Sequence, residues 1–437
     1  MNNDELKSRS LRFSLWDGVF ASLMTGFTQD YFAPFLISIG GSNTQIGVLS
    51  ALSNLFSSLS QLKSSLAVRL FSRRSVILFL VYLQALALIP IVLLTGFPNP
   101  SPVIFIILAV LFSTSGAFSL PAWGSLMADL LDEDKRGQYF GWRGSILGLF
   151  LVACSFAAGA ILNFFKNRNP MTGFCLIFSL ACAARLGSWY FLTRMHDPAP
   201  GSGSLEKEAG AIFNRHWRES NFLRFVFFIS ALNFSLNVAG PFYTVLMLRD
   251  LKFSYLLYTC IILTSTLTTY LMMKSWGSLA DRIGNIKVIK FTSRYVSLLP
   301  LLWVLTQKPQ LLFFFQVIGG FVYAGYNLAV SNFVYDSSPA GSRTGHIAFY
   351  NAATGTSACL GALFGTFIIH HLPPIDGNPI LSVIFLSALL RIFVVFLFPY
   401  KPAEVRKVEK MHSYEIFRTV TGLKLLPGHA DRGGSSG

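Results

Sequence analysis

Charged side chains inside long apolar runs are the residues of this sequence most able to do chemistry. Burying a charge in a membrane is costly, so an ionisable group at such a place is a functional candidate. Asp30 is the clearest case, because it lies 18 residues beyond Arg12, about 27 Å along a helix. A carboxyl at that depth, beside Thr28, Gln29 and Tyr31, could carry a coupling proton. An ionised Asp at the outer mouth of a wet cavity is the alternative.

Other charges within the apolar runs have plainer explanations. Asp17 lies nearer to the basic N-terminal segment than Asp30 does, so we expect it to have less of a coupling role. Lys63 lies close to the end of its run, from which a long side chain can reach the membrane surface. Arg185 and Arg391 occupy matching places in the sixth and twelfth runs. We expect these arginines to pair with carboxylates or helix-end carbonyls rather than with a substrate.

The apolar runs predict an all-α integral membrane protein. Of the 437 residues, 53% are hydrophobic and only 13% are charged, which excludes the balance of a soluble domain. The runs have the length of spanning helices, about 20 residues, and do not alternate as barrel strands would. Twelve spans are predicted, at 13–38, 44–68, 75–96, 102–128, 141–165, 171–193, 222–248, 253–275, 287–306, 310–334, 345–370 and 379–399.

The basic residues predict the topology. The formal net charge is +15, and 26 of the 35 Lys and Arg residues fall at the two ends or in even-numbered loops, against 5 in odd-numbered loops. This bias places both termini in the cytoplasm. No basic stretch is interleaved with aromatic residues, so we expect the lipid bilayer and no nucleic acid as a partner.

A long linker divides the chain into two halves. The segment 197–218 is the longest interior linker and is rich in Pro, Gly and Ser. The predicted organisation is an N-terminal six-helix half at 1–195, a cytoplasmic linker at 196–220, a C-terminal six-helix half at 221–400 and a cytoplasmic tail, partly disordered, at 401–437.

The two halves carry matching sequence elements. The string at 65–70 is echoed at 278–283, and 33–35 is echoed at 240–242. Further matches at nearly constant offset are Asp129 and Arg136 with Asp336 and Arg343, and Arg185 with Arg391. Two halves of equal orientation predict a parallel repeat of six helices.

Two loop motifs carry a family resemblance. The segment 276–285 reads W-G-S-L-A-D-R-I-G-N and resembles the G-x-L-a-D-r-x-G-r motif of the major facilitator superfamily. The segment 129–141 resembles the D-x(6)-R-G-x(3)-G element of that family. The resemblance extends through about Tyr400 and implies the twelve-helix fold, secondary transport and alternating access. The first-half loop departs from the pattern, since Val68 stands where the Asp belongs.

Charges in these motifs are candidates for gating. A carboxylate near a helix N-terminus meets a positive dipole end and neighbouring arginines, and a pair formed in one conformation only would shift a two-state equilibrium. Solvated loop charges, worth about 0 to 1 kcal/mol each, are the alternative. The gating candidates are Asp281 with Arg282, Asp129 with Arg136, and Asp336 with Arg343.

The resemblance also implies which spans line a central cavity, namely 1, 4, 7 and 10, with 2, 5, 8 and 11 beside them. Asn237, Tyr326 and Asn327 fall mid-span, where a buried polar group needs a partner. A lining of amides and aromatic rings suits a small, largely neutral or amphipathic organic solute. The cavity candidates are Gln29, Trp123, Asn233, Asn237, Tyr243, Tyr323, Tyr326, Asn327, Tyr350 and Asn351, with Asp30 as the coupling candidate.

Several absences from the sequence narrow the function. There is no G-x(4)-G-K-[ST] loop and no set of nucleophile, base and oxyanion donors, so we expect neither ATP-driven transport nor an enzyme. His346, His370 and His371 lack an acid or Cys spaced for coordination, so no metal and no cofactor are expected. The sequence therefore predicts a monomeric transporter of a small-molecule substrate in a bacterial inner membrane. The alternative is a non-transporting receptor or assembly partner of the same fold, acting through the tail at 401–437.

Overall fold

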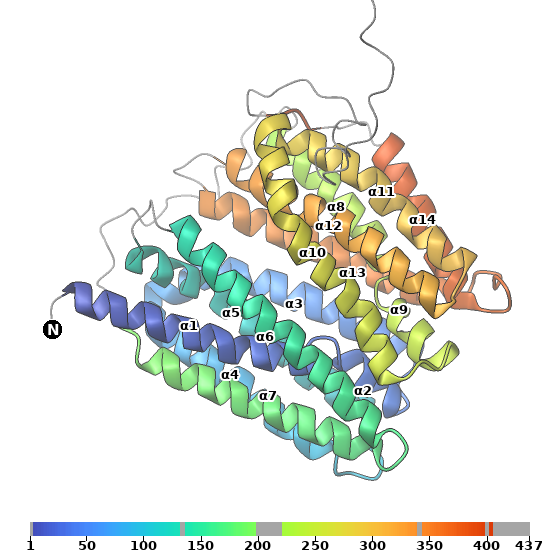
Figure 1. The fold of residues 1–437 in the computed structure, drawn as a ribbon, viewed down its shortest axis with the longest axis horizontal. Helices are drawn as coiled ribbons and strands as arrows, with labels where there is room; N and C mark the ends of the chain where they lie inside the picture. Colours follow the sequence, from blue (N-terminus) through green and yellow to red (C-terminus); the bar gives the residue numbers. More distant parts are fainter. Residues whose placement is uncertain (1–2, 132–135, 198–220, 339–342, 398–401, 405–437) are drawn as a thin grey trace, which may run out of the picture.

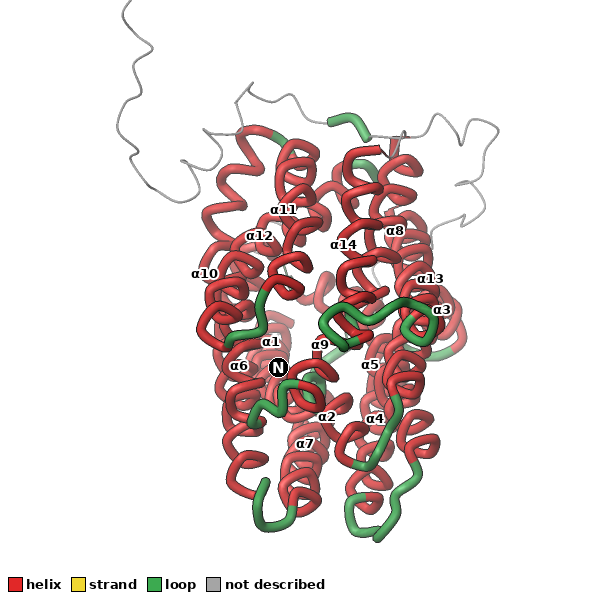
Figure 2. The backbone as a smooth tube through the Cα atoms, turned by 90° about the vertical axis from the view of Figure 1, so that its right-hand side faces the viewer, coloured by secondary structure: helices red, strands yellow, loops and turns green. Residues whose placement is uncertain are grey.

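The computed structural model describes residues 3–131, 136–197, 221–338, 343–397 and 402–404. Almost all of the predicted linker and most of the predicted tail lie outside these residues. The described chain consists of helices joined by short loops (Figures 1 and 2). The helices of the first half are α1 (Asn3–Thr28), α2 (Phe32–Ser38), α3 (Asn43–Leu70), α4 (Arg73–Leu94), α5 (Pro102–Leu130), α6 (Arg136–Phe165) and α7 (Pro170–Thr193).

The second half repeats this order of elements. It contains α8 (Asn221–Ala239), α9 (Phe242–Val245), a π-helical turn (Leu246–Asp250), α10 (Tyr255–Ile283), α11 (Asn285–Leu305), α12 (Pro309–Asp336), α13 (Arg343–Ile368) and α14 (Pro379–Leu397). All twelve predicted spans are therefore confirmed as helical segments.

Three predicted spans differ from the helices in detail. The first and seventh spans are interrupted, because α1 gives way to α2 before Pro34 and α8 gives way to α9 at Pro241. A proline cannot donate to the helical ladder, so both breaks occur at the matched prolines of the repeat. The eighth span is longer than predicted, since α10 continues to Ile283 and ends at Gly284, whose φ of +90° suits glycine. Asp281, expected in a loop, lies in the last turn of α10.

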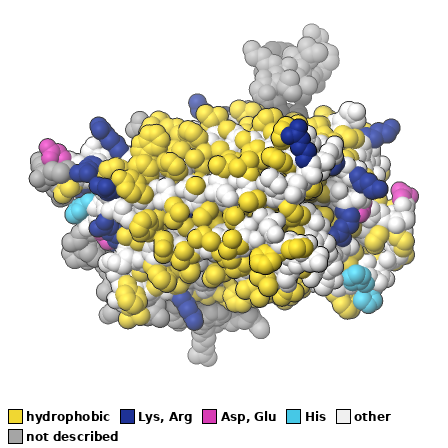
Figure 3. Space-filling view, turned by 90° about the horizontal axis from the view of Figure 1, so that it is seen from below, with side chains coloured by type: hydrophobic (Ala, Val, Ile, Leu, Met, Phe, Trp, Pro, Cys, Tyr) yellow, Lys and Arg dark blue, Asp and Glu magenta, His cyan; other side chains and the backbone are white. Residues whose placement is uncertain are grey.

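Nine helices of the described chain are long and apolar enough to cross a membrane, from their length and composition. The other three predicted spans, α1 with α2, α3 and α13, carry more polar residues. Their location explains this composition, because α3 packs against α13, and α1 against α6 and α7. Side chains in these contacts face other helices, so they need less hydrophobicity than side chains that face lipid. Figure 3 shows hydrophobic side chains over most of the middle of one face and charged side chains mainly toward the two ends.

The packing of the core distinguishes the two ends of the bundle. We call the end that holds the start of α1 and the end of α10 the basic end, and the end that holds α2 and α9 the far end. At the far end, one continuous core joins both halves and includes Tyr31, Phe35, Phe174, Phe242 and Tyr258. At the basic end, each half has a core of its own. The halves are therefore closed against each other at the far end.

Helix α13 approaches α8 very closely within the second half. A Cβ atom on Gly361 would collide with the carbonyl oxygen of Phe234, and one on Gly365 would collide with that of Val238. Small residues four apart on one helix face are the usual means of close approach between membrane helices.

We therefore expect Gly361→Ala to lower the free energy of unfolding by about 1–3 kcal/mol, because the added methyl group forces the two helices apart. Gly144→Ala is the matched control, since open space surrounds that position and alanine favours a helix by about 1 kcal/mol. Thermal unfolding of the purified variants in detergent measures the difference. Equal melting temperatures for the two variants would contradict the packing described.

Candidate functional site

Hydrogen bonds between the halves surround the break between α1 and α2. The hydroxyl of Tyr31 donates to the carbonyl oxygen of Ser155 at 2.5 Å and lies 2.8 Å from Oγ1 of Thr259 in the other half. The hydroxyl of Tyr258 donates to the backbone carbonyl of Asp30 at 3.0 Å. The carboxylate of Asp30 is half-buried and accepts from Oγ of Ser155 at 3.4 Å. The coupling candidate thus lies directly beside the contacts that close the far end.

More contacts across the halves follow at the far end. Arg249, which follows α9, donates from Nη1 to Oδ1 of Asn43 at 2.8 Å and from Nη2 to the carbonyl oxygen of Gly41 at 2.5 Å. Oγ1 of Thr44 lies 3.3 Å from Nε2 of His370. These residues lie in α3 and the loop before it, in the π-helical turn after α9 and in the loop after α13, so the far end is closed on more than one side.

Helices α6 and α10 diverge toward the basic end. Near the far end, a Cβ atom on Gly159 would collide with the side chain of Thr259, and nearer the middle one on Gly148 would lie 3.4 Å from the ring of Tyr270. Gly144 and Gly141, one and two turns closer to the basic end, have nothing within 4 Å of that position. Helices α6 and α10 therefore contact each other along their outer part, and no side chain of α10 lies against Gly144 or Gly141 near the basic end.

A group of charges ties the basic end of the first half together. Arg73, in the first turn of α4, forms ion pairs with Asp129 at the end of α5 and, at 2.9 Å, with Asp197 after α7. The second oxygen of Asp197 accepts from the backbone N–H of Arg74 at 3.3 Å. A carboxylate at this place satisfies an N–H group that the helix leaves unpaired. The ends of α4, α5 and α7 are thus fixed to one another.

The second half repeats this arrangement with different residue types. Asn285, in the first turn of α11, donates to Oδ2 of Asp336 at 2.7 Å, and Glu404 accepts from the backbone N–H of Ile286 at 2.7 Å. Asp336 and Glu404 follow Asp129 and Asp197 by the same 207 residues. The duplication seen in the sequence therefore extends to the contacts. Both networks lie within one half, so they hold that half as a unit.

The predicted gating partners of these carboxylates are not all described. The side chains of Arg136 and Arg343 lie outside the described part of the structure, so their pairing with Asp129 and Asp336 stays a prediction. Asp281 and Arg282 are exposed at the end of α10, and neither is without a partner. Sequence reasoning missed Arg73 as the partner of Asp129, because Arg73 is adjacent only in space.

A buried polar cluster lies within the first half, where Asp17 was expected to matter less. Asp17 accepts from Oγ of Ser188 at 2.7 Å, and Ser188 in turn accepts from Arg185 at 3.1 Å. Nη2 of Arg143 lies 3.9 Å from the carboxylate of Asp17 and donates to the carbonyl oxygen of Ser14 at 3.0 Å. All three charged residues are buried. The scaffold role expected for Arg185 is consistent with this contact.

Arg143 is the member of this cluster that sequence reasoning missed. It lies near the start of a predicted span and was counted with the loop cations. In the structure its guanidinium lies 4.7 Å from the centroid of the Trp123 ring, an arrangement typical of a cation–π contact. Trp123, a predicted cavity residue, is thus placed beside Asp17 and Arg143. The signal available in the sequence was Gly18, where a Cβ atom would collide with the guanidinium of Arg143.

The cavity candidates of the second half fall into two groups. Tyr323 and Tyr326 meet edge to face at 6.4 Å, and Arg391 lies within interaction distance of Tyr243 and Tyr326. The hydroxyl of Tyr326 is buried and finds no hydrogen-bond partner among the described residues. Arg391 itself donates to the carbonyl oxygens of Val296 and Leu236. Tyr243, Tyr323 and Tyr326 thus lie close to the buried Arg391, and their part in a cavity stays a prediction.

The other predicted cavity residues make contacts within their own helix, with a neighbouring helix of the same half, or with the other half. Asn233 and Asn237 donate to carbonyl oxygens one turn earlier in α8, so both amides satisfy themselves locally. The ring of Tyr350 stacks on Phe225, and Asn351 donates to Gln61 of the other half at 2.9 Å. Two of the predicted cavity residues, Gln29 and Asn327, are exposed. The structure thus places Asn351 in an interface between the halves.

The buried pair of Asp17 and Arg143 makes a measurable prediction. We expect Arg143→Gln to lower the free energy of unfolding by about 3 kcal/mol, because it leaves a carboxylate buried beside one fewer cation. In the double variant Asp17→Asn/Arg143→Gln, the loss should be smaller than the sum of the two single losses. Thermal unfolding in detergent measures all three. Arg168→Gln, an exposed cation, is the control, and strictly additive effects would contradict the pairing.

Comparison with known proteins identifies the fold. A family model described as the Major Facilitator Superfamily matches residues 18–305 and 223–427. The crystal structure of a point mutant of the nucleoside transporter NupG superposes with a TM-score of 0.70 at 13% identity, covering 90% of this chain and 98% of that one. The structure of NupG itself gives a TM-score of 0.65 at 14% identity, covering 91% and 98%. No curated protein sequence matches the chain.

At such low identity, the likeness to NupG concerns the fold alone. The family match, in contrast, spans most of the chain and includes both halves. It agrees with the duplicated networks at the basic end and with the matched helix breaks. This chain belongs to the major facilitator superfamily, a family of transporters and not of enzymes.

Proposed function

We propose that this protein is a secondary active transporter that moves a small organic solute by alternating access, with Asp30 carrying a coupling proton. The observation that carries this proposal is the difference between the two ends. One core joins the halves at the far end, whereas two separate cores occupy the basic end. Two halves that are each held together internally can rock about the shared end.

The surroundings of Asp30 support its coupling role. Its carboxylate and its backbone carbonyl both take part in the contacts near the break between α1 and α2, and two of the nearby donors, Tyr258 and Thr259, belong to the other half. If the far end opens, these partners move away and Asp30 meets a different environment. A group whose environment differs between two conformations links proton binding to the conformational equilibrium. Asn237, at the matching place in the second half, has no charge to titrate.

The solute proposed is small, organic and largely uncharged. The candidates in the second half offer tyrosine rings and amides, and the first half offers Trp123, which lies beside Arg143. Aromatic rings with a few polar groups suit a flat, neutral molecule. Because the superposed structures are of a nucleoside transporter, nucleosides are the first class to test. The gating charges Asp281, Arg282, Asp129, Arg136, Asp336 and Arg343 are proposed to hold the basic end when it closes.

We propose that the protein works as a monomer in a bacterial inner membrane. The distribution of Lys and Arg then puts the basic end and both termini in the cytoplasm. In this orientation the conformation described here faces the cytoplasm.

The proposal is tested first by ligand-dependent thermal stability and then by transport. A solute present at about 100 times its Kd should stabilise the purified protein by about 2.7 kcal/mol, so a panel of nucleosides, sugars and amphipathic metabolites will identify the class. In proteoliposomes, we expect Asp30→Asn to abolish uptake driven by a pH gradient and to retain solute exchange. Asp376→Asn, an exposed carboxylate, is the matched control and should behave as the parent does. Uptake by Asp30→Asn that still follows the pH gradient would refute the coupling role.

A further inference from the structure

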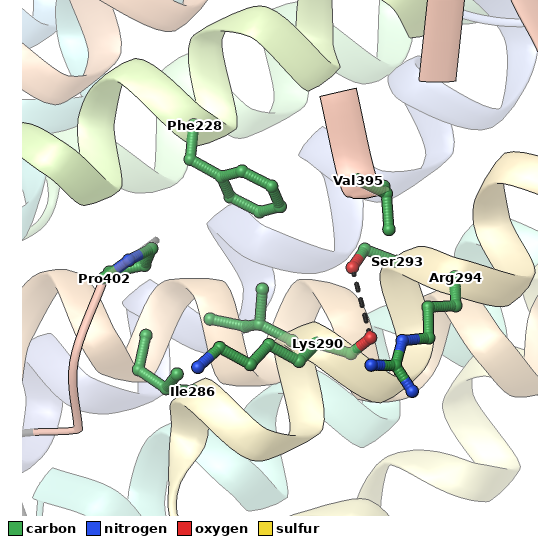
Figure 4. Close-up of a pocket in the computed structure, with 8 residues that line it drawn as sticks. Phe228, Ile286, Lys290, Ser293, Arg294, Val395 and Pro402 are labelled. Carbon is green, nitrogen blue, oxygen red and sulfur yellow. Dashed lines mark hydrogen bonds between the residues drawn. The ribbon is translucent and has the colours of Figure 1, made fainter. Parts of the chain in front are cut away.

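A pocket at the basic end of the second half lies apart from the predicted transport path. It opens between α8, α11 and α14 and holds about 420 Å³ of empty space, part of it open to the surroundings. Apolar side chains form most of its wall, and Figure 4 shows Phe228 and Val395 approaching it from α8 and α14. Pro402, in the short segment after α14, closes one side. A recess that is partly open to the surroundings can hold the headgroup end of a lipid whose chains remain outside it.

Two cations of α11 line this apolar pocket. Lys290 and Arg294 are exposed and lie four residues apart, so they share one face of the helix. They follow Asn285 by five and nine residues, which places them about 8 and 14 Å into α11. Figure 4 shows the ammonium group of Lys290 extending toward Ile286 and Pro402. If the start of α11 lies at the membrane surface, this depth is near the boundary between lipid headgroups and acyl chains, where an exposed cation attracts an anionic headgroup.

The first half shows what this place looks like without a pocket. The register that pairs Asn285 with Arg73 also pairs Arg294 with Tyr82. The register of the last helices pairs Val395 with Trp189. Tyr82 and Trp189 pack against each other with ring centroids 5.5 Å apart. The first half therefore has the rings of Tyr82 and Trp189 at this place. At the matching positions, the second half has Arg294 and the smaller Val395.

We propose that this pocket binds the phosphate headgroup of an anionic phospholipid from the leaflet next to the basic end. Lys290 and Arg294 are exposed on one helix face, and their long side chains would turn toward the phosphate and form charge-assisted hydrogen bonds with its oxygens. The acyl chains would run along the apolar wall of Phe228, Ile289 and Val395. A soluble phosphate would gain nothing from that wall, so the pocket matches a lipid and not a free anion. This binding requires no transport of solute.

The test uses the full chain in nanodiscs of phosphatidylcholine with increasing phosphatidylglycerol, with bound lipid counted by native mass spectrometry after release. The parent protein should retain phosphatidylglycerol saturably. Lys290→Gln/Arg294→Gln should weaken retention about tenfold or more, since each cation near an anionic lipid contributes on the order of 1 kcal/mol. The matched control is Lys63→Gln/Lys274→Gln, which removes two exposed cations at a similar depth and should retain the lipid as the parent does.

A second variant tests the shape of the pocket, because it fills the space with aromatic rings and keeps Lys290. Arg294→Tyr/Val395→Trp installs the residues of the first half, so it should fill the pocket and abolish saturable retention while the melting temperature stays close to that of the parent. Equal retention by the parent and both pocket variants would overturn the proposal. So would an equal loss in the Lys63→Gln/Lys274→Gln control, or displacement of the lipid by millimolar inorganic phosphate.

Discussion

In each half, a carboxylate accepts a hydrogen bond from a backbone N–H group at the start of another helix. The carboxylate follows α7 and the helix is α4 in the first half; in the second half they are α14 and α11. Asp197 does this for Arg74, and Glu404 does it for Ile286. The N–H groups in the first turn of a helix have no intrahelical partners. An acceptor placed there satisfies a donor that would otherwise be left unpaired near the membrane. A second carboxylate, Asp129 or Asp336, binds the side chain of the same turn. The ends of three helices are thereby held at fixed distances.

This constraint would let the halves move as bodies, as the proposed alternating access requires. If each half is fixed at the basic end by its own contacts, then closure there need not rearrange either core. The contacts that must break and form are those between the halves. At the far end these include the hydrogen bonds of Tyr31, Tyr258 and Arg249, all polar and each worth a modest amount of free energy. Asp30 lies beside these contacts, since its backbone carbonyl accepts from Tyr258, and the coupling proposed for its carboxylate would act next to them.

Much of the fold was predictable because it depends on local properties of the sequence. The length of an apolar run fixes the number of spans, and the offsets between matched residues reveal the duplication. The break at Pro241 follows from chemistry, yet the span was predicted as continuous. The extension of α10 through Asp281 was missed because the charges suggested a loop. Buried Leu279, Ala280 and Ile283 keep that segment helical until Gly284.

The candidate site was less predictable, because its contacts join residues far apart in the sequence. Arg73 and Asp129, or Tyr31 and Thr259, become partners only when helices pack, and no spacing rule along the chain relates them. Arg143 was counted as a loop cation, because a side chain so near the end of a predicted span can be exposed to solvent. The structure instead buries it beside Asp17 and Trp123. Charge counts along a sequence give the orientation of a membrane protein but not the partner of each charge.

The most direct test of alternating access is the distance between α6 and α10 at the basic end. Gly148 faces Tyr270 and Gly159 faces Thr259, and the same register brings Gly144 opposite Lys274 when the helices close. Spin labels at the exposed Ser145 and Ser278, on a background without the five cysteines, report this distance by double electron–electron resonance. We predict two distance populations, with the short one growing when a stabilising solute binds. A single distance that no solute changes would contradict the account.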